Sequence, residues 1–128
     1  MKSSRRLAAH AQEIGAWGMG AMASPFPKVA RVEELVQYCE EIASGAPELP
    51  FYYYHIPAFN GVYLSMVEFL QTVDGRIPNF AGIKYTYENL YEYNQCRLYK
   101  NGKFDMLHGQ DETILPTQIG RASCRERV

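Results

Sequence analysis

A lysine inside an otherwise apolar segment is the first candidate for chemistry in this sequence. Lys84 lies in FAGIKYT, residues 80–86, a run of β-favouring and small residues. An ammonium group is rarely buried without a partner, and burial favours the neutral amine. A neutral lysine amine can attack a carbonyl group and form a Schiff base. The alternative is a lysine at a strand end whose ammonium reaches solvent or pairs with a carboxylate.

A tyrosine-rich segment, PFYYYHIP, supplies the second candidate. Side chains alternate between the two faces of a strand, so Tyr52 and Tyr54 share one face and Tyr53 and His55 the other. A buried tyrosine hydroxyl needs a partner, and beside a lysine it can relay protons. The alternative is aromatic packing between a sheet and its helices, with His55 as an ordinary hydrogen-bonding residue.

The third candidate is the segment HGQDE, residues 108–112. Gly109 allows another group to approach the backbone closely. Asp111 and Glu112 offer acceptors for a ligand rich in hydroxyl groups. The alternative is structural, with Asp111 capping a helix and Glu112 interacting favourably with the helix dipole.

Helices and strands alternate along the chain and must position these candidates. Strands are predicted at residues 17–23, 49–56, 80–86 and 103–109. A first helix is expected to bury Leu7, Ala8, Ala11 and Ile14 and to stop at Gly15. Three more helices are expected: one with Val32, Leu35, Val36, Cys39 and Ile42 on one stripe, one with Met66, Val67 and Leu70 inward, and one over about 87–99. A last helix begins near DETILP.

This alternation predicts a parallel sheet with helices packed outside it. Tyr54, Lys84 and the segment from Gly109 to Glu112 all fall at or just after the carboxyl ends of successive strands. In parallel α/β proteins that rim is where active sites lie.

Composition excludes several functional classes. The chain has 128 residues and a net charge of −1, which gives no basic field for nucleic acid and no polybasic segment for a membrane surface. No apolar run approaches the roughly 20 residues that span a bilayer. The first residues lack the apolar core of a secretory signal, and the three cysteines lack metal-ligand spacing. We therefore expect a cytoplasmic protein with reduced thiols.

The last ten residues, IGRASCRERV, break the pattern. They have no apolar periodicity and concentrate three arginines. Their sequence reads as the in-frame translation of a common sequencing adapter; the alternative is an ordinary basic tail. We therefore expect residues 1–118 to form the fold and residues 119–128 to be a non-native tail.

Three motifs together resemble the N-acetylneuraminate lyase (sialic acid aldolase) family. They are PFYYYHIPAFNGV, AGIKYT and HGQDE, in this order and at this separation, preceded by LAAHAQEIGAWGMGAMASPF. That family belongs to the dihydrodipicolinate synthase-like class I aldolases. The resemblance covers about residues 2–117 and implies an α/β fold: a partial (β/α)8 TIM barrel, about half the barrel, from its third helix to the start of its seventh.

The resemblance also implies roles for individual residues. Lys84 matches the Schiff-base lysine, and Tyr54 matches the tyrosine that moves the proton during carbon–carbon cleavage. Thr86 matches a substrate-contacting threonine. Gly109, Asp111 and Glu112 match the loop that holds the sugar tail. The implied reaction is reversible cleavage of N-acetylneuraminate to N-acetylmannosamine and pyruvate, with a covalent imine and no metal or other cofactor.

Other expectations follow from where this sequence departs from the family. Its Gly-Thr-Thr-Gly or Gly-Ser-Thr-Gly carboxylate-binding turn does not occur here. We therefore expect this chain to be inactive alone. The resemblance itself implies that the full-length family member is a homotetramer. One alternative is a dihydrodipicolinate synthase-like pyruvate aldolase, which usually carries an arginine where this chain has Ala58-Phe59-Asn60. The other is a non-catalytic half-barrel or interaction module.

Overall fold

The protein is built on one four-stranded parallel sheet. The structure, a computed structural model, describes residues 2–119. The strands are β1 (Met19–Met22), β2 (Phe51–His55), β3 (Phe80–Tyr85) and β4 (Asp105–His108). They lie side by side in chain order, and each pairs in parallel with the next. The predicted alternation and the predicted parallel sheet are confirmed.

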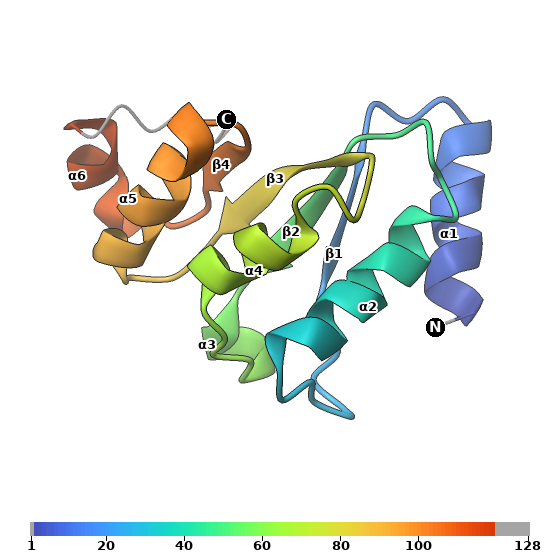
Figure 1. The fold of residues 1–128 in the computed structure, drawn as a ribbon, viewed down its shortest axis with the longest axis horizontal. Helices are drawn as coiled ribbons and strands as arrows, with labels where there is room; N and C mark the ends of the chain where they lie inside the picture. Colours follow the sequence, from blue (N-terminus) through green and yellow to red (C-terminus); the bar gives the residue numbers. More distant parts are fainter. Residues whose placement is uncertain (1, 120–128) are drawn as a thin grey trace.

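Helices connect successive strands and form a layer beside the sheet. The longer ones are α1 (Lys2–Glu13), α2 (Val32–Ala43), α4 (Met66–Val73) and α5 (Leu90–Leu98). The shorter ones are α3 (Pro57–Asn60), η1 (Tyr99–Asn101), η2 (Asp111–Thr113) and α6 (Ile114–Ile119). In Figure 1, α2 and α4 lie in front of the strands and α1 stands at one end. Helix α2 packs against α1 and α4, and α4 packs against α5.

The core lies between this helical layer and one face of the sheet. The predicted stripe of α2 is buried as expected: Val32, Leu35, Val36, Cys39 and Ile42. Phe69 of α4 packs its ring 5.0 Å from that of Tyr53 in β2 and 5.7 Å from that of Phe80 in β3. Met66 and Leu70 are also buried, whereas Val67 is only half-buried. The helix-facing side of the sheet is therefore a densely packed aromatic and aliphatic core.

Helix α1 corrects one part of the sequence prediction. Leu7 and Ile14, expected to face inward, are 68% and 69% exposed, and only Ala8 is buried. The helix ends as predicted, with Gly15 at a φ of +77°. Its main neighbour is α2, so only a narrow strip of its surface is covered.

Helix α5 begins later than predicted, at Leu90. The Asn89 side chain accepts a hydrogen bond from the backbone N–H of Glu92, which caps the first turn. Tyr87, predicted to lie near the helix start, instead packs its ring edge-on to His55 at 5.8 Å. Asn89 thus fixes the helix start and leaves Tyr87 to the core.

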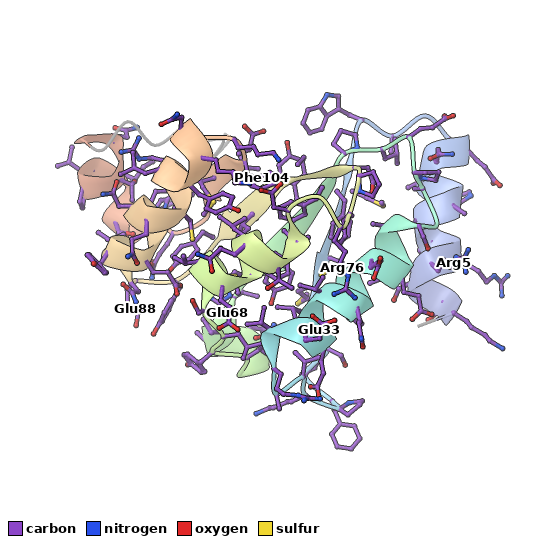
Figure 2. The ribbon with its side chains drawn as sticks, viewed as in Figure 1. Arg5, Glu33, Glu68, Arg76, Glu88 and Phe104 are labelled. Carbon is purple, nitrogen blue, oxygen red and sulfur yellow. The ribbon has the colours of Figure 1, made fainter. Side chains whose placement is uncertain are left out.

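Polar side chains tie the helical layer together at its surface. Figure 2 shows Arg76, which follows α4, beside Glu33 of α2. Arg76 Nη1 lies 2.6 Å from Glu33 Oε1, and Nη2 lies 3.1 Å from Glu40 Oε2. Asp74 accepts hydrogen bonds from Lys100, Lys103 and the Tyr99 hydroxyl. These hydrogen bonds lower the pKa of Asp74 well below its ordinary value.

Two further sequence expectations concern membrane-spanning segments and the C-terminal tail. Within residues 2–119, no helix is long and apolar enough to cross a membrane. Residues 120–128 of the expected non-native tail lie outside the described part of the chain, while Ile119 ends α6. The division of the chain at residue 118 therefore stays a prediction.

Candidate active site

The candidate catalytic residues lie on the sheet face opposite the core, here called the inner face. Strand register places its residues in two rows. The lower row is Gly20, Tyr52, Gly82 and Asp105, and the upper row is Met22, Tyr54, Lys84 and Leu107. Except for Tyr52 and Gly82, these residues are half-buried or exposed.

Lys84 and Tyr54 are direct neighbours in the upper row. They occupy paired positions on β3 and β2, and the Lys84 Nζ lies over the Tyr54 ring, 4.5 Å from its centroid. A cation over an aromatic face is attracted by the negative potential of the ring. Tyr54 can therefore hold the amine in place, and its hydroxyl is on the same face for proton transfer.

The structure corrects the expectation that Lys84 is enclosed in a buried strand. Strand β3 buries Ile83 and Tyr85 against the helices, but Lys84 points to the other face and is only half-buried. The apolar run in the sequence reflects burial of one face alone. The lysine needs no ion-pair partner to occupy this position.

Thr86 and Gly109 close the upper end of the site. The Thr86 N–H donates to the His55 carbonyl at 2.8 Å, and the Gly109 N–H donates to the Tyr85 carbonyl at 2.9 Å, so the ladder runs one residue past each strand. A Cβ atom on Gly109 would lie 2.1 Å from Thr86 Oγ1 and 3.2 Å from Lys84 Cε. Only glycine fits between these two side chains.

The Thr86 hydroxyl oxygen is enclosed by the surrounding protein. It is buried, and among the described residues it has no hydrogen-bond partner. A buried polar atom without a partner carries a cost that a bound polar group can relieve. Thr86 therefore lies beside Gly109 at the site and has a hydroxyl group whose hydrogen bond is not yet used.

Asp111 and Glu112 lie in η2, two and three residues beyond Gly109, and both are exposed. The Thr113 hydroxyl lies 3.0 Å from His108 Nε2, which anchors η2 to the end of β4. The N-cap of η2 is Gln110, so the structural alternative in which Asp111 caps a helix is wrong. Both carboxylates remain exposed at the strand-end rim.

His55 belongs to the core and not to the site. It is 1% exposed, and its ring packs against those of Tyr85 and Tyr87 at 5.1 and 5.8 Å. Burial lowers the pKa of His55 from 6.5 to about 4. His55 lies on the helix-facing side of β2, opposite to Tyr54, as strand alternation predicts.

The sequence prediction missed the contacts of Tyr52 in the lower row. The Tyr52 hydroxyl donates to Asp105 Oδ2 at 2.9 Å, and the Trp17 ring stacks on Tyr52 with centroids 6.2 Å apart. Strand alternation alone places Tyr52 on the same face as Tyr54. Placing Asp105 beside Tyr52 requires the register between β3 and β4, which the sequence does not give. Residues 2–119 contain no group of three or more His, Cys, Asp or Glu side chains placed to hold a metal ion.

Comparison with known proteins gives the family. The model of the dihydrodipicolinate synthetase family matches residues 1–124. The chain belongs to the dihydrodipicolinate synthetase family. It is 41% identical over 115 residues to N-acetylneuraminate lyase B of Xenopus laevis, covering 90% of this chain and 43% of that protein. It is 40% identical over 120 residues to N-acetylneuraminate lyase of Rattus norvegicus, covering 93% of this chain and 38% of that protein.

Solved structures of family members share the fold. N-acetylneuraminate lyase from Aliivibrio salmonicida matches with a TM-score of 0.90 at 39% identity, over 94% of this chain and 40% of that chain. The Proteus mirabilis lyase matches with a TM-score of 0.89 at 33% identity, over 94% and 40%. The chain is thus homologous to N-acetylneuraminate lyases, which are carbon–carbon lyases, and spans well under half of their length. The predicted resemblance and the predicted partial barrel are both confirmed.

Proposed function

We propose that this chain carries part of the active site of an N-acetylneuraminate lyase, with Lys84 as the imine-forming residue. The observation that carries the proposal is the pair of Lys84 and Tyr54, with Nζ 4.5 Å from the ring centroid at the carboxyl edge of the sheet. Homology to lyases of this name supports it. The roles below are proposals for this chain.

The reaction begins at Lys84. Its neutral amine attacks the keto carbon of open-chain N-acetylneuraminate, water leaves, and uptake of one proton from solvent gives a protonated imine. The imine withdraws electrons as the carbon–carbon bond breaks, which releases N-acetylmannosamine and leaves the enamine of pyruvate. Protonation of the enamine and hydrolysis of the imine release pyruvate and restore the amine. The covalent imine provides the electron sink, so the proposal includes no cofactor.

Tyr54 moves the proton in this scheme. Bond cleavage requires a base to take the proton from the sugar hydroxyl, and the reverse reaction requires an acid to return it. Tyr54 is the titratable side chain paired in register with Lys84 on β2. We assign the proton transfer to its hydroxyl.

The remaining predicted residues bind substrate. The Thr86 hydroxyl, which has no partner among the described residues, donates to the substrate, and Gly109 leaves room for the Thr86 and Lys84 side chains. Asp111 and Glu112 accept hydrogen bonds from the hydroxyl groups of the sugar tail. Their exposure on η2 leaves both carboxylates accessible to a ligand at the rim.

Sialic acid is favoured over the second substrate of a dihydrodipicolinate synthase. Enzymes of that type usually carry an arginine after the tyrosine turn to bind a second carboxylate, and this chain has Ala58, Phe59 and Asn60 there. The Asn60 amide is already used within the fold, where it donates to the Ala23 carbonyl and accepts from the Val62 N–H. None of these three residues therefore supplies a cation for a carboxylate.

We further propose that this chain alone does not complete a catalytic cycle. It covers 38–43% of the length of its lyase relatives and lacks the carboxylate-binding turn sequence of that family. Cytoplasmic location and a homotetramer of the full-length protein belong to the same proposal. If imine trapping failed on a folded sample, the alternative of a non-catalytic half-barrel would be favoured.

Imine trapping tests the proposal. The chain is incubated with pyruvate, reduced with borohydride, and weighed by mass spectrometry. We expect one reduced pyruvyl adduct per chain, abolished by Lys84→Arg, which keeps the charge but cannot form the imine. A folded sample, verified by circular dichroism, that gains no mass would contradict the proposal.

A further inference from the structure

The lower row of the inner face contains a polar pair that spans three strands. Tyr52 on β2 and Asp105 on β4 are both in register with Gly82 on β3. The Tyr52 hydroxyl donates to Asp105 Oδ2 at 2.9 Å, across the intervening strand. The hydrogen bond therefore connects the two strands that flank Lys84.

Gly82 makes this bridge possible. A Cβ atom at this position would lie 2.1 Å from the Asp105 carbonyl oxygen and 2.8 Å from its carbon. Any side chain there would strike the β4 backbone and fill the space between Tyr52 and Asp105. On its other side the Tyr52 ring stacks on Trp17, with an interplanar angle of 22°. The tyrosine is thus held from both sides and is 8% exposed.

The pair lies one row below the candidate catalytic residues. Lys84 pairs with Leu107, and Asp105 precedes Leu107 by two residues on the same face. With strands about 4.8 Å apart and a rise of about 3.3 Å per residue, such diagonal neighbours lie about 8 Å apart. Among the eight inner-face residues of the two rows, Asp105 is the one carboxylate and Lys84 the one cation.

We propose that Tyr52 and Asp105 are positioning residues for Lys84, with Tyr52 holding the Asp105 carboxylate below the amine. The inference rests on the proposed imine chemistry. The carboxylate favours a positive charge on the lysine nitrogen, both in the resting ammonium and in the protonated imine. No proton changes place in the pair: Tyr52 keeps its hydroxyl proton and donates it to Asp105 as a hydrogen bond.

Other described residues also lie near the Lys84 side chain. Tyr54 on β2 lies under its nitrogen, and Gly109 at the end of β4 lies close to its Cε. Asp111 and Glu112 follow on η2. The test must therefore separate Asp105 from these carboxylates and from a general change in net charge.

Acylation of Lys84 as a function of pH measures the effect without any substrate. The full chain is pulsed with acetic anhydride between pH 6 and 11, and the modification of Lys84 is read by peptide mass spectrometry. Only the neutral amine reacts, so the pH midpoint reports the charge on the nitrogen. The variants are Asp105→Asn, Asp105→Glu and Tyr52→Phe, with Glu41→Gln on the exposed side of α2 as the charge-matched control.

The expected shift follows from the lost attraction. Charges about 8 Å apart interact by roughly 0.4 to 1.5 pH units at effective dielectric constants of about 80 to 20. Because Asp105 is exposed, we expect the lower part of this range. Asp105→Asn lowers the midpoint by about half a unit, and Asp105→Glu restores most of it. Tyr52→Phe lowers it by less, since the carboxylate remains but is no longer held.

An unchanged midpoint in Asp105→Asn would overturn the inference, even if the variant lost stability. An equal shift in Glu41→Gln would also overturn it, because net charge alone would then account for the effect. Pyruvate trapping on the same samples keeps the two proposals apart. A shift in acylation without any pyruvate adduct would refute the imine function while leaving the electrostatic contact intact.

Discussion

The two faces of the four-stranded sheet differ in what they bury and in what they can do. The helix-facing side carries Phe51, Tyr53, Ile83 and Tyr85, each fully buried. The inner face carries Lys84, Tyr54 and Asp105, which are half-buried or exposed, and two glycines. Stability comes from the first face and reactive groups from the second. Strand alternation lets neighbouring residues, such as Tyr53 and Tyr54, serve these two purposes separately.

Truncation of Phe69 tests this division with the largest expected effect. Phe69→Ala removes a fully buried ring that packs on Tyr53 and Phe80, so we expect a loss of about 3–5 kcal/mol in the free energy of unfolding. The inner-face control, Leu107→Ala, removes a half-buried side chain and should cost less than about 1.5 kcal/mol. Urea unfolding measures both. Equal losses would show that the two faces are not distinct.

The pH dependence of stability tests the burial of His55. The folded pKa of about 4 lies below the ordinary value of 6.5, so the unfolded chain takes up this proton first as the pH falls. The stabilisation is fully present above pH 6.5 and is lost between 6.5 and about 4, by roughly 3 kcal/mol. His55→Asn removes this titration.

The comparison of wild type with His55→Asn isolates the histidine from the carboxylates. Asp74, whose pKa is lowered by its lysine partners, is present in both proteins and its contribution cancels. Unfolding free energies at pH 7.5 and 4.5 should differ less in the variant than in the wild type. The same pH dependence in both would mean that His55 is not buried as a neutral ring.

Alanine substitutions of two glycines on the inner face test the same comparison, with smaller expected changes in stability. Gly82→Ala forces a Cβ atom against the Asp105 backbone and should cost about 1–3 kcal/mol. Gly20→Ala places its Cβ 3.5 Å from the nearest atom, an ordinary contact, and should change stability by less than about 1 kcal/mol. Thermal unfolding distinguishes them. If Gly20→Ala were the more harmful change, the close approach of β3 and β4 would be refuted.

Much of the fold was predictable from local patterns. The α2 stripe and the four strands follow from residue periodicity, and the shared face of Tyr52 and Tyr54 follows from strand alternation. Because the carboxyl ends of parallel strands meet at one edge of a sheet, Tyr54 was expected to lie near Lys84. Sequence motifs then added Thr86 and the Gly109 loop, and in the structure Gly109 lies close to both Thr86 and Lys84.

What remained hidden depends on contacts between distant segments. Asp105 could not be matched to Tyr52, because the register of β2, β3 and β4 includes a shift between Phe51 and Tyr52 that no local pattern records. The apolar spacing of α1 likewise predicts a buried Leu7 and Ile14 without saying which neighbour covers them. Periodicity identifies a face, and tertiary packing decides whether that face is buried.

Site mapping of the imine tests the central claim most directly. The chain is trapped with pyruvate and borohydride, digested, and each lysine peptide is quantified. Lys2, Lys28, Lys100 and Lys103 are all exposed, whereas Lys84 is half-buried beside Tyr54. The inner-face chemistry predicts that the adduct concentrates on Lys84 despite its lower exposure. Adducts distributed among the four exposed lysines, with Lys84 unmodified, would contradict it.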